Sequence, residues 1–140
     1  MILVDTSIWS LALRRRRGDL GVADQRHVHE WERLVRLGVV AMIGPIRQEL
    51  LSGIRDQRMR ERLRRALRPF PDLALDVEDY EHAAGCFNRC RAQGIAGSAV
   101  DFMICAASMR YAAPIYTADR DFERYAGVLE LTLHQVNPQA

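Results

Sequence analysis

Lysine is absent from this sequence of 140 residues, and all 20 of its basic residues are arginines. The absence excludes several classes of enzyme, because Walker-type phosphate loops, Schiff-base and pyridoxal chemistry, and protein kinases each depend on a lysine amine. Genome composition alone can produce such an arginine preference, but these enzyme classes are excluded whatever its cause. The 18 acidic residues leave a formal net charge of only +2, so any attraction to nucleic acid has to be local.

Long apolar runs are lacking as well. No stretch approaches the ~18 consecutive apolar residues that a membrane span requires. Only the short apolar run from Ile2 to Val4 precedes Asp5. This run has neither the basic residues nor the apolar length of a secretory signal. We therefore expect a cytoplasmic protein without membrane association.

Cysteine and histidine are scarce, and their spacing suggests no metal site. Cys86, Cys90 and Cys105 are too few and too uneven for a disulfide framework, which fits a reduced compartment. Cys86 and Cys90 lie four apart, but neither a second pair nor a suitably spaced histidine completes a zinc site. We interpret them as structural cysteines and assign no role to the four histidines.

What is present is an alternation of short apolar runs with amphipathic segments. A chain of this size buries roughly two-thirds of its unfolded surface, which is enough for one core, so we expect a single domain over residues 1–140. The alternation predicts an α/β domain with a mainly parallel sheet and helices on both faces. The expected strands are 1–4, 39–43, 73–77, 114–116 and 129–136. Two expected helices start at Ile8 and at Gly44-Pro45, and four others cover 23–37, 55–68, 78–93 and 99–111. A last short helix contains Phe122 and Tyr125.

Four carboxylates occupy apolar surroundings. Asp5 and Asp119 each follow a predicted strand, while Glu49 and Asp101 lie within apolar helical segments. A carboxylate in such company has to be paired, protonated or bound to a cation. Taken singly, Asp5 and Asp119 are also compatible with cap or turn residues, Glu49 with an exposed helix position, and Asp101 with a favourable place in the first turn of a helix.

The predicted topology brings these four residues to one edge. In open parallel sheets, functional residues lie beyond the carboxyl ends of the strands. The strand ends that carry Asp5 and Asp119 and the helix starts that carry Glu49 and Asp101 are expected at this edge. Two divalent cations would compensate four carboxylates and accept their oxygens as ligands. That arrangement is typical of metal-assisted phosphodiester cleavage.

The sequence resembles PIN-domain ribonucleases, and among them the VapC-type toxins of bacterial type II toxin–antitoxin modules. The resemblance runs the length of the chain, in four segments whose order is specific: Met-Ile-Leu-Val-Asp-Thr-Ser at the start, Gln-Glu-Leu-Leu-Ser-Gly at 48–53, Ser-Ala-Val-Asp-Phe-Met-Ile-Cys-Ala-Ala at 98–107, and Thr-Ala-Asp-Arg-Asp-Phe at 117–122. It implies a PIN-like three-layer α/β/α domain with a mainly parallel central sheet.

The same resemblance implies an endoribonuclease that depends on Mg²⁺, with Mn²⁺ as a substitute, and that is inhibited by a cognate antitoxin protein. Asp5, Glu49, Asp101 and Asp119 match its acidic quartet, as metal ligands and catalytic residues, and Asp121 is a rival for the fourth place. RNA would be the substrate, and a homodimer is expected on this ground alone. Thr6 and Thr117 are candidates either to hydrogen-bond a carboxylate or water or to act as capping hydroxyls.

Two other functions are open to a chain of this type. Phosphatases and receiver domains also place an Asp after the first strand, but the phosphatase motif requires a second Asp where this chain has Ser7, and both classes usually use a lysine. A PIN-like protein that binds without cleaving would have no reason to keep four costly carboxylates together.

Arginines are concentrated in two segments. The predicted helix 55–68 holds seven arginines against Asp56 and Glu61, a local charge of +5, and Arg14 to Arg17 form a second run. Each is compatible with RNA phosphate contact, with antitoxin binding or with a solvated surface. Trp9, Phe102 and Phe122 are expected in the core.

Overall fold

A three-stranded parallel sheet lies at the centre of the computed structural model, which describes residues 1–136. Strand β1 (Ile2–Val4) is central, between β2 (Val40–Ala41) and β3 (Ile115–Tyr116), in the order β2-β1-β3. Ile2 is in register with Val40, and Val4 with Tyr116. Leu3 and Val4 are both fully buried, so β1 is covered on both faces, as its continuous apolar run predicts.

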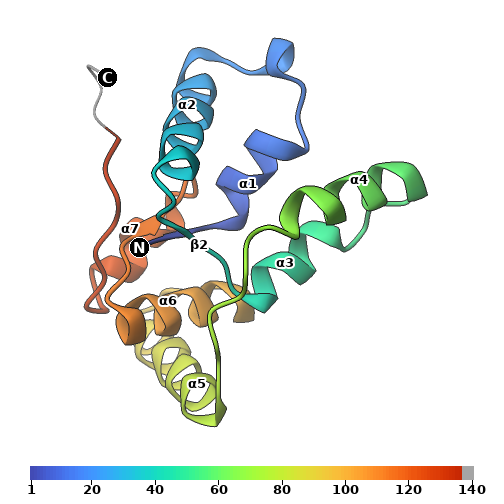
Figure 1. Cartoon of the computed structure of the whole chain (residues 1–140). Coiled ribbons are helices and arrows are strands. Elements are labelled where there is room, and N and C mark those ends of the chain that lie inside the picture. Colours follow the sequence, from blue (N-terminus) through green and yellow to red (C-terminus); the bar gives the residue numbers. More distant parts are fainter. Residues whose placement is uncertain (137–140) are drawn as a thin grey trace.

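Helices cover both faces of this sheet (Figure 1). Helices α1 and α2 lie on one side, while α5 and α6 pack together on the other. This arrangement confirms the expected fold class. In chain order the helical elements are α1 (Thr6–Leu13), the 3₁₀ turn η1 (Arg17–Asp19), α2 (Val22–Arg36), α3 (Gly44–Leu51), α4 (Gln57–Leu67), α5 (Val77–Ala92), α6 (Ala99–Tyr111) and α7 (Asp121–Ala126).

Local signals set most helix starts. The Ser98 hydroxyl accepts the backbone N–H of Asp101 at 3.1 Å and caps α6, as expected. Pro45 lies in the first turn of α3, where its missing N–H leaves no bond unmade. At α1 the expectation was wrong: the helix starts at Thr6 rather than Ile8, and Asp5 occupies the N-cap position without a side-chain cap bond.

Two expected strands are not formed. The segment 73–77 forms no strand: Leu73 donates its N–H to the Met42 carbonyl at 2.8 Å beside an isolated bridge between Asp72 and Met42. Val77 is already helical, because Asp76 and Asp79 form a reciprocal capping box at the start of α5. The segment 129–136 makes a single bridge, between Leu133 and Ile115. Strand β3 is two residues long, so it offers this segment little to pair with.

The core lies between the sheet and its two helical layers. Trp9, Phe102 and Phe122 are buried in it, as predicted. All three cysteines are also buried and free, in keeping with a structural role. Across residues 1–136, no helix combines the length and the apolar character needed to cross a membrane.

Candidate acidic active site

The carboxyl ends of β1 and β3 place Asp5 beside residues 117–119. The Asp5 backbone N–H donates to the Tyr116 carbonyl at 2.8 Å, which fixes the start of α1 against the end of β3. The Asp5 side chain is only 4% exposed, and its Oδ2 accepts hydrogen bonds from Thr117 Oγ1 at 2.7 Å and from Ser7 Oγ at 2.8 Å. The parallel topology therefore creates the expected juxtaposition around Asp5.

Two hydroxyl groups are oriented toward Asp5 by backbone donors. Ser7 Oγ accepts the N–H of Ala118 at 2.9 Å, and Thr117 Oγ1 accepts the N–H of Asp119 at 2.9 Å. Each hydroxyl carries one proton, which is then free to be donated to the Asp5 carboxylate. Thr117 thus hydrogen-bonds the Asp5 carboxylate, the first of the two roles considered for it, and its bond to the Asp119 N–H is a turn contact, since α7 begins only at Asp121. Thr6 has a buried hydroxyl without a hydrogen-bond partner in the described part of the chain.

Asp101 enters the site from the first turn of α6. Its Oδ2 accepts a hydrogen bond from the buried Tyr125 hydroxyl of α7 at 2.6 Å. Gly97 packs closely against this pair, because a Cβ at that position would collide with the Tyr125 hydroxyl and lie 2.9 Å from the Phe102 ring. The orientation of Asp101 is therefore fixed by an interaction between α6 and α7.

The electrostatics of Asp5 set it apart from an ordinary capping residue. Burial raises the pKa of Asp5, and the Asp101 carboxylate raises it further, while the hydrogen bonds from Thr117 and Ser7 act in the opposite direction. No ion pair joins Asp5 to an Arg or His within residues 1–136. Asp5 is a buried acid whose charge the described chain does not neutralise.

Asp119 and Asp121 have different partners. Asp119 Oδ1 accepts the N–H of Asp121 at 2.9 Å, so Asp119 makes the turn contact that its sequence context suggested. Asp121 pairs with Arg124 at 3.1 Å and is half exposed. Both acids, together with Asp101, raise the pKa of Tyr125, whose burial has the largest effect. Asp101, Asp119 and Asp121 therefore surround one buried phenol.

Glu49 is the exception among the four acids. Its side chain is exposed on α3, and it makes no hydrogen bond or ion pair with the described residues. Residues 1–136 contain no group of three His, Cys, Asp or Glu side chains arranged to hold a metal ion. The structure thus links Asp5 with Asp101 and places Asp119 and Asp121 beside Asp101 through Tyr125, while the assignment of Glu49 stays a prediction.

The donor chemistry of the site fits a hard divalent cation. Its ligands are carboxylate oxygens, and Mg²⁺ commonly binds through one or two protein carboxylates while water and substrate phosphates complete its shell. The mutual repulsion of Asp5 and Asp101 and the missing internal counter-charge are the conditions under which a cation is stabilising. The buried cysteines offer no competing soft site, because burial raises the pKa of the Cys86, Cys90 and Cys105 thiols.

Sequence reasoning missed the roles of Ser7 and Tyr125 in the site. The position of Ser7 two residues after Asp5 is a usable signal, because Ser side chains often bond neighbouring polar groups. Tyr125 carries no comparable signal, since its contact with Asp101 spans 24 residues.

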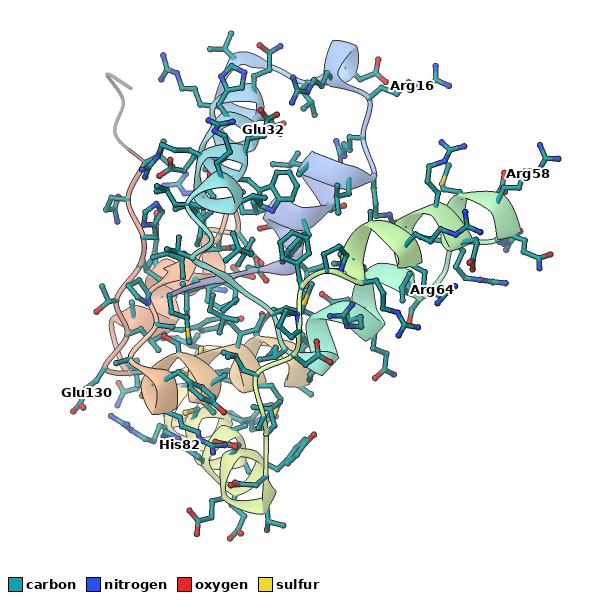
Figure 2. The ribbon with its side chains drawn as sticks, viewed as in Figure 1. Arg16, Glu32, Arg58, Arg64, His82 and Glu130 are labelled. Carbon is teal, nitrogen blue, oxygen red and sulfur yellow. The ribbon has the colours of Figure 1, made fainter. Side chains whose placement is uncertain are left out.

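An arginine-rich surface lies on α4 and its preceding loop, at some distance from the sheet. Figure 2 shows Arg58 and Arg64 projecting from α4 and Arg16 from the loop after α1. Arg64 and Arg65 pair with Glu61. Five further arginines in this region are exposed and have no ion pair within residues 1–136, namely Arg55, Arg58, Arg60, Arg62 and Arg68.

Comparison with known proteins places this fold and its acidic edge in a family. The family model described as PIN domain matches residues 2–128. Ribonuclease VapC11 of Mycobacterium tuberculosis and a VapC ribonuclease of Mycobacterium bovis are each 32% identical to this chain over 133 residues, which cover 94% of the chain and 96% of the relative.

Solved structures share the fold at lower identity. FitAcB from Neisseria gonorrhoeae superposes with a TM-score of 0.74 at 20% identity, covering 96% of this chain and 97% of that one. VapBC2 from Rickettsia felis, solved bound to a DNA fragment from their promoter, gives a TM-score of 0.74 at 15% identity, covering 98% of this chain and all of the other. The chain belongs to the PIN-domain family.

Proposed function

We propose that this chain is a cytoplasmic endoribonuclease, dependent on Mg²⁺ or Mn²⁺, that acts as the toxin of a toxin–antitoxin pair. The VapC relatives support ribonuclease activity, since their names state it. The observation that carries the metal-dependent chemistry is Asp5, a buried carboxylate whose pKa the Asp101 carboxylate helps to raise and which has no ion pair in the described chain.

Asp5 and Asp101 would hold the cation, with Asp119 and Glu49 completing the acidic quartet directly or through water. When bound, the divalent ion supplies Lewis-acid stabilisation of negative charge on the scissile phosphate and lowers the pKa of water. The chain's own contribution is orientation: Ser7 and Thr117 fix Asp5, and Tyr125 fixes Asp101. Asp119 is favoured over Asp121 as the fourth acid, because Asp121 is already paired with Arg124.

Cleavage of a mixed RNA pool tests this function. Purified wild type and Asp5→Asn protein are incubated with Mg²⁺, with Mn²⁺ and with a chelator. We expect wild type alone to cut RNA, and the chelator to abolish cutting. Because a selective enzyme can miss its target in such a pool, Mn²⁺ titration of both proteins accompanies the assay. Wild type that neither cuts RNA nor binds Mn²⁺ more tightly than Asp5→Asn contradicts the proposal.

Two protein partners are proposed as well, a cognate antitoxin and a second copy of this chain. A cognate antitoxin protein is inferred from the toxin–antitoxin resemblance, and the arginine-rich surface of α4 is a candidate for it or for RNA. A homodimer is inferred as well, and an apolar hollow of about 460 Å³ between α5 and α6, with Tyr80 and Phe87 in its wall, offers surface for one. Light scattering of wild type and Tyr80→Glu tests the dimer, which the charged variant should weaken.

A further inference from the structure

A second hollow, of about 510 Å³, opens directly beside the acidic edge. Its wall includes Thr117 and Asp119 from the site, Arg120 from the start of α7, and two histidines, His27 from α2 and His134 from the segment after α7. The volume exceeds what a single nucleotide occupies, within the range of small-ligand pockets. Neither histidine has a role in the acidic site.

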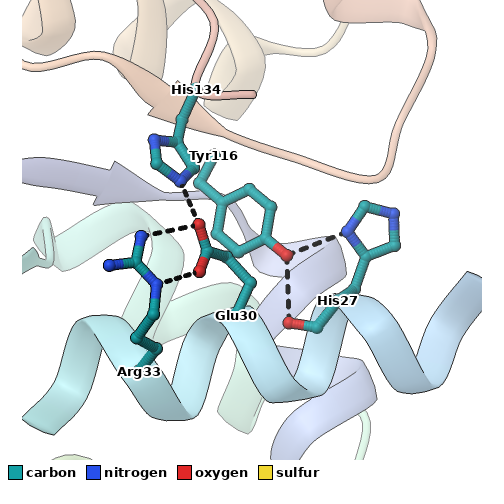
Figure 3. A network of polar contacts seen from close by, with 5 residues as sticks. All are labelled: His27, Glu30, Arg33, Tyr116 and His134. Atoms are coloured by element: carbon teal, nitrogen blue, oxygen red, sulfur yellow. Dashed lines mark hydrogen bonds and ion pairs between the residues drawn. The ribbon is translucent and has the colours of Figure 1, made fainter. Parts of the chain in front are cut away.

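The protonation of His27 follows from its hydrogen bonds (Figure 3). The Tyr116 hydroxyl donates its one proton to the His27 carbonyl at 2.9 Å. The second contact, between Tyr116 Oη and His27 Nδ1 at 2.9 Å, then has to be donated by the imidazole Nδ1–H. Burial lowers the pKa of His27, against a smaller opposite effect of Asp24, and so favours the neutral ring in which Nδ1 carries the proton. Its Nε2 is therefore an unprotonated acceptor.

The opposite wall is held rigidly. His134 Nε2 contacts Glu30 Oε2 at 2.6 Å, and the same carboxylate accepts two bonds from Arg33, at 2.6 and 3.0 Å. The His134 backbone N–H donates to the Ile115 carbonyl at 2.7 Å, and its ring packs edge-on against Tyr116 at 5.2 Å. Figure 3 shows this network joining α2 to β3 and to the segment after α7 that carries His134. The hollow is thus bounded by groups with fixed positions.

We propose that this hollow is a ribonucleotide subsite, in which His27 Nε2 accepts a hydrogen bond from a ribose 2′-hydroxyl and Arg120 contacts a phosphate. The inference rests on the proposed ribonuclease function. A 2′-hydroxyl is the group by which a protein distinguishes RNA from DNA, and a neutral imidazole nitrogen is an acceptor of the required kind. Because Asp119 is shared by the hollow and the acidic edge, a nucleotide here would bring its neighbouring phosphate to that edge.

Charge in the wall limits where the phosphate can lie. Asp119 and Glu123 repel it, and Glu123 lies 3.9 Å from Arg120 and partly offsets that cation. The Arg120 side chain is 90% exposed, so it can reorient toward solvent-side phosphate. The phosphate is therefore assigned to the outer rim beside Arg120, and the sugar to the inner wall beside His27. Under this assignment His27 is a positioning and specificity-determining residue.

Histidine ring NMR tests the subsite without any cleavage. The chain has four histidines, and His29 and His82 are exposed residues outside the hollow, so they serve as internal controls. The probes are AMP, CMP, GMP and UMP, compared with their 2′-deoxy forms, in chelator and on the Asp5→Asn protein. We expect saturable shifts of the His27 and His134 signals, with deoxy forms binding about threefold to tenfold more weakly, the effect of one hydrogen bond.

Substitutions assign the effect to its groups. His27→Ala should abolish the discrimination between ribo and deoxy probes, whereas His27→Gln, whose amide oxygen can accept a bond, should restore part of it. Arg120→Gln should weaken every nucleotide, with Arg91→Gln on α5 as the matched control. In RNA cleavage, His27→Ala should raise KM severalfold and leave kcat within about twofold, a split that a merely structural role would not give.

The outcomes separate this proposal from the function on which it rests. Shifts that are absent at millimolar nucleotide, or equal for the exposed His29 and His82, overturn the subsite and leave the hollow to a protein partner. Equal affinity for ribo and deoxy forms overturns the assigned contact of His27. Metal-dependent RNA cleavage without nucleotide shifts would refute the subsite alone, whereas specific shifts without cleavage or Mn²⁺ binding would refute the ribonuclease.

Discussion

Asp5 and Glu30 are both buried carboxylates, with 4% and 8% of their surface exposed, yet they have different partners. Glu30 contacts Arg33 and His134, and the hydrogen bond from Arg33 is the main reason that its pKa is lowered. Asp5 contacts two neutral hydroxyls and faces Asp101, and burial raises its pKa. A third buried acid, Asp79, also has a lowered pKa, mainly through the hydrogen bond that the Asp76 backbone N–H donates to it and further through Arg110, which pairs with it.

This difference is the basis for our proposal that Asp5 is a functional acid, whereas Glu30 and Asp79 are structural ones. Where this chain buries a carboxylate for stability, it supplies an arginine, which compensates the lost hydration. At Asp5 it supplies only orientation, so the unfavourable charge is left for a ligand to neutralise. Uncompensated ionisable groups of this kind are typical of functional sites.

The largest expected effect is on cleavage. Asp5→Asn should lower the rate of metal-dependent RNA cleavage by about 100-fold or more, because it removes an anionic ligand from the site. Glu30→Gln should leave the rate within about threefold, since its carboxylate is satisfied by the protein. Rates are measured on the same RNA at saturating Mg²⁺. A comparable loss in both variants would mean that the two acids do not differ in function.

A smaller loss of activity is expected when Asp101 loses its positioning group. Tyr125→Phe keeps the buried ring but removes the hydroxyl that donates to Asp101 at 2.6 Å, so the carboxylate is no longer fixed. Cleavage should fall about tenfold, in the range seen for outer partners of metal ligands. Tyr111→Phe, which removes a hydroxyl that bonds the Ala74 carbonyl away from the acidic site, is the control and should leave cleavage unchanged. Unchanged cleavage in Tyr125→Phe would show that Asp101 needs no such support.

Glu30→Gln should instead lower the free energy of unfolding by about 2 kcal/mol, because it breaks charge-assisted hydrogen bonds to Arg33 and His134. The folded pKa of Glu30 lies below its ordinary value of 4.5, so the stabilisation is present above that pH and is lost as pH falls through the folded value. Urea unfolding at several pH values measures this.

The matched control for Glu30→Gln is Glu81→Gln, an exposed acid of α5 without an ion pair in the described chain. It should change stability by less than about 0.5 kcal/mol. A Glu30→Gln effect that is independent of pH between neutrality and pH 3 would contradict the assignment of the lowered pKa to this pair.

The smallest effect has the opposite sign. In chelator, Asp5→Asn should raise the free energy of unfolding by about 1 kcal/mol at neutral pH, or Tm by roughly 2–4 °C, because an uncompensated buried charge is removed. The pKa of Asp5 in the folded protein lies above its ordinary value of 3.8. The cost of burying the charged carboxylate is therefore absent below pH 3.8, and it is incurred as the pH rises through the pKa of the folded protein. The gain should therefore vanish in acid.

Addition of Mg²⁺ sharpens the same measurement. Wild type should gain stability from the cation and Asp5→Asn should not, because binding to the folded state alone raises Tm. If Asp5→Asn were destabilised in chelator at neutral pH, the charge of Asp5 would have to be compensated by the protein after all.

Much of this architecture could be predicted from local sequence signals. The apolar run before Asp5, the Ser98 cap and the glycine and proline boundaries of α3 each act within a few residues, and the structure confirms them. The segments 73–77 and 129–136 failed because strand formation depends on an available partner, which no local pattern reports. The pairing of Asp5 with Thr117 was within reach, since both follow parallel strands. The contacts of Tyr125 with Asp101 and of Tyr116 with His27 were not, because no strand order or local pattern in the sequence places those side chains together.

The central position of β1 has a consequence for the timing of activity during synthesis. Asp5 and Ser7 are translated before Thr117 and Tyr125, which orient the carboxylates and follow them by more than 100 residues. At about 5–20 residues per second, roughly ten seconds separate the synthesis of these two parts of the site. The site therefore cannot assemble until both parts have been synthesised, and under the proposed function a shorter nascent chain would not cleave RNA.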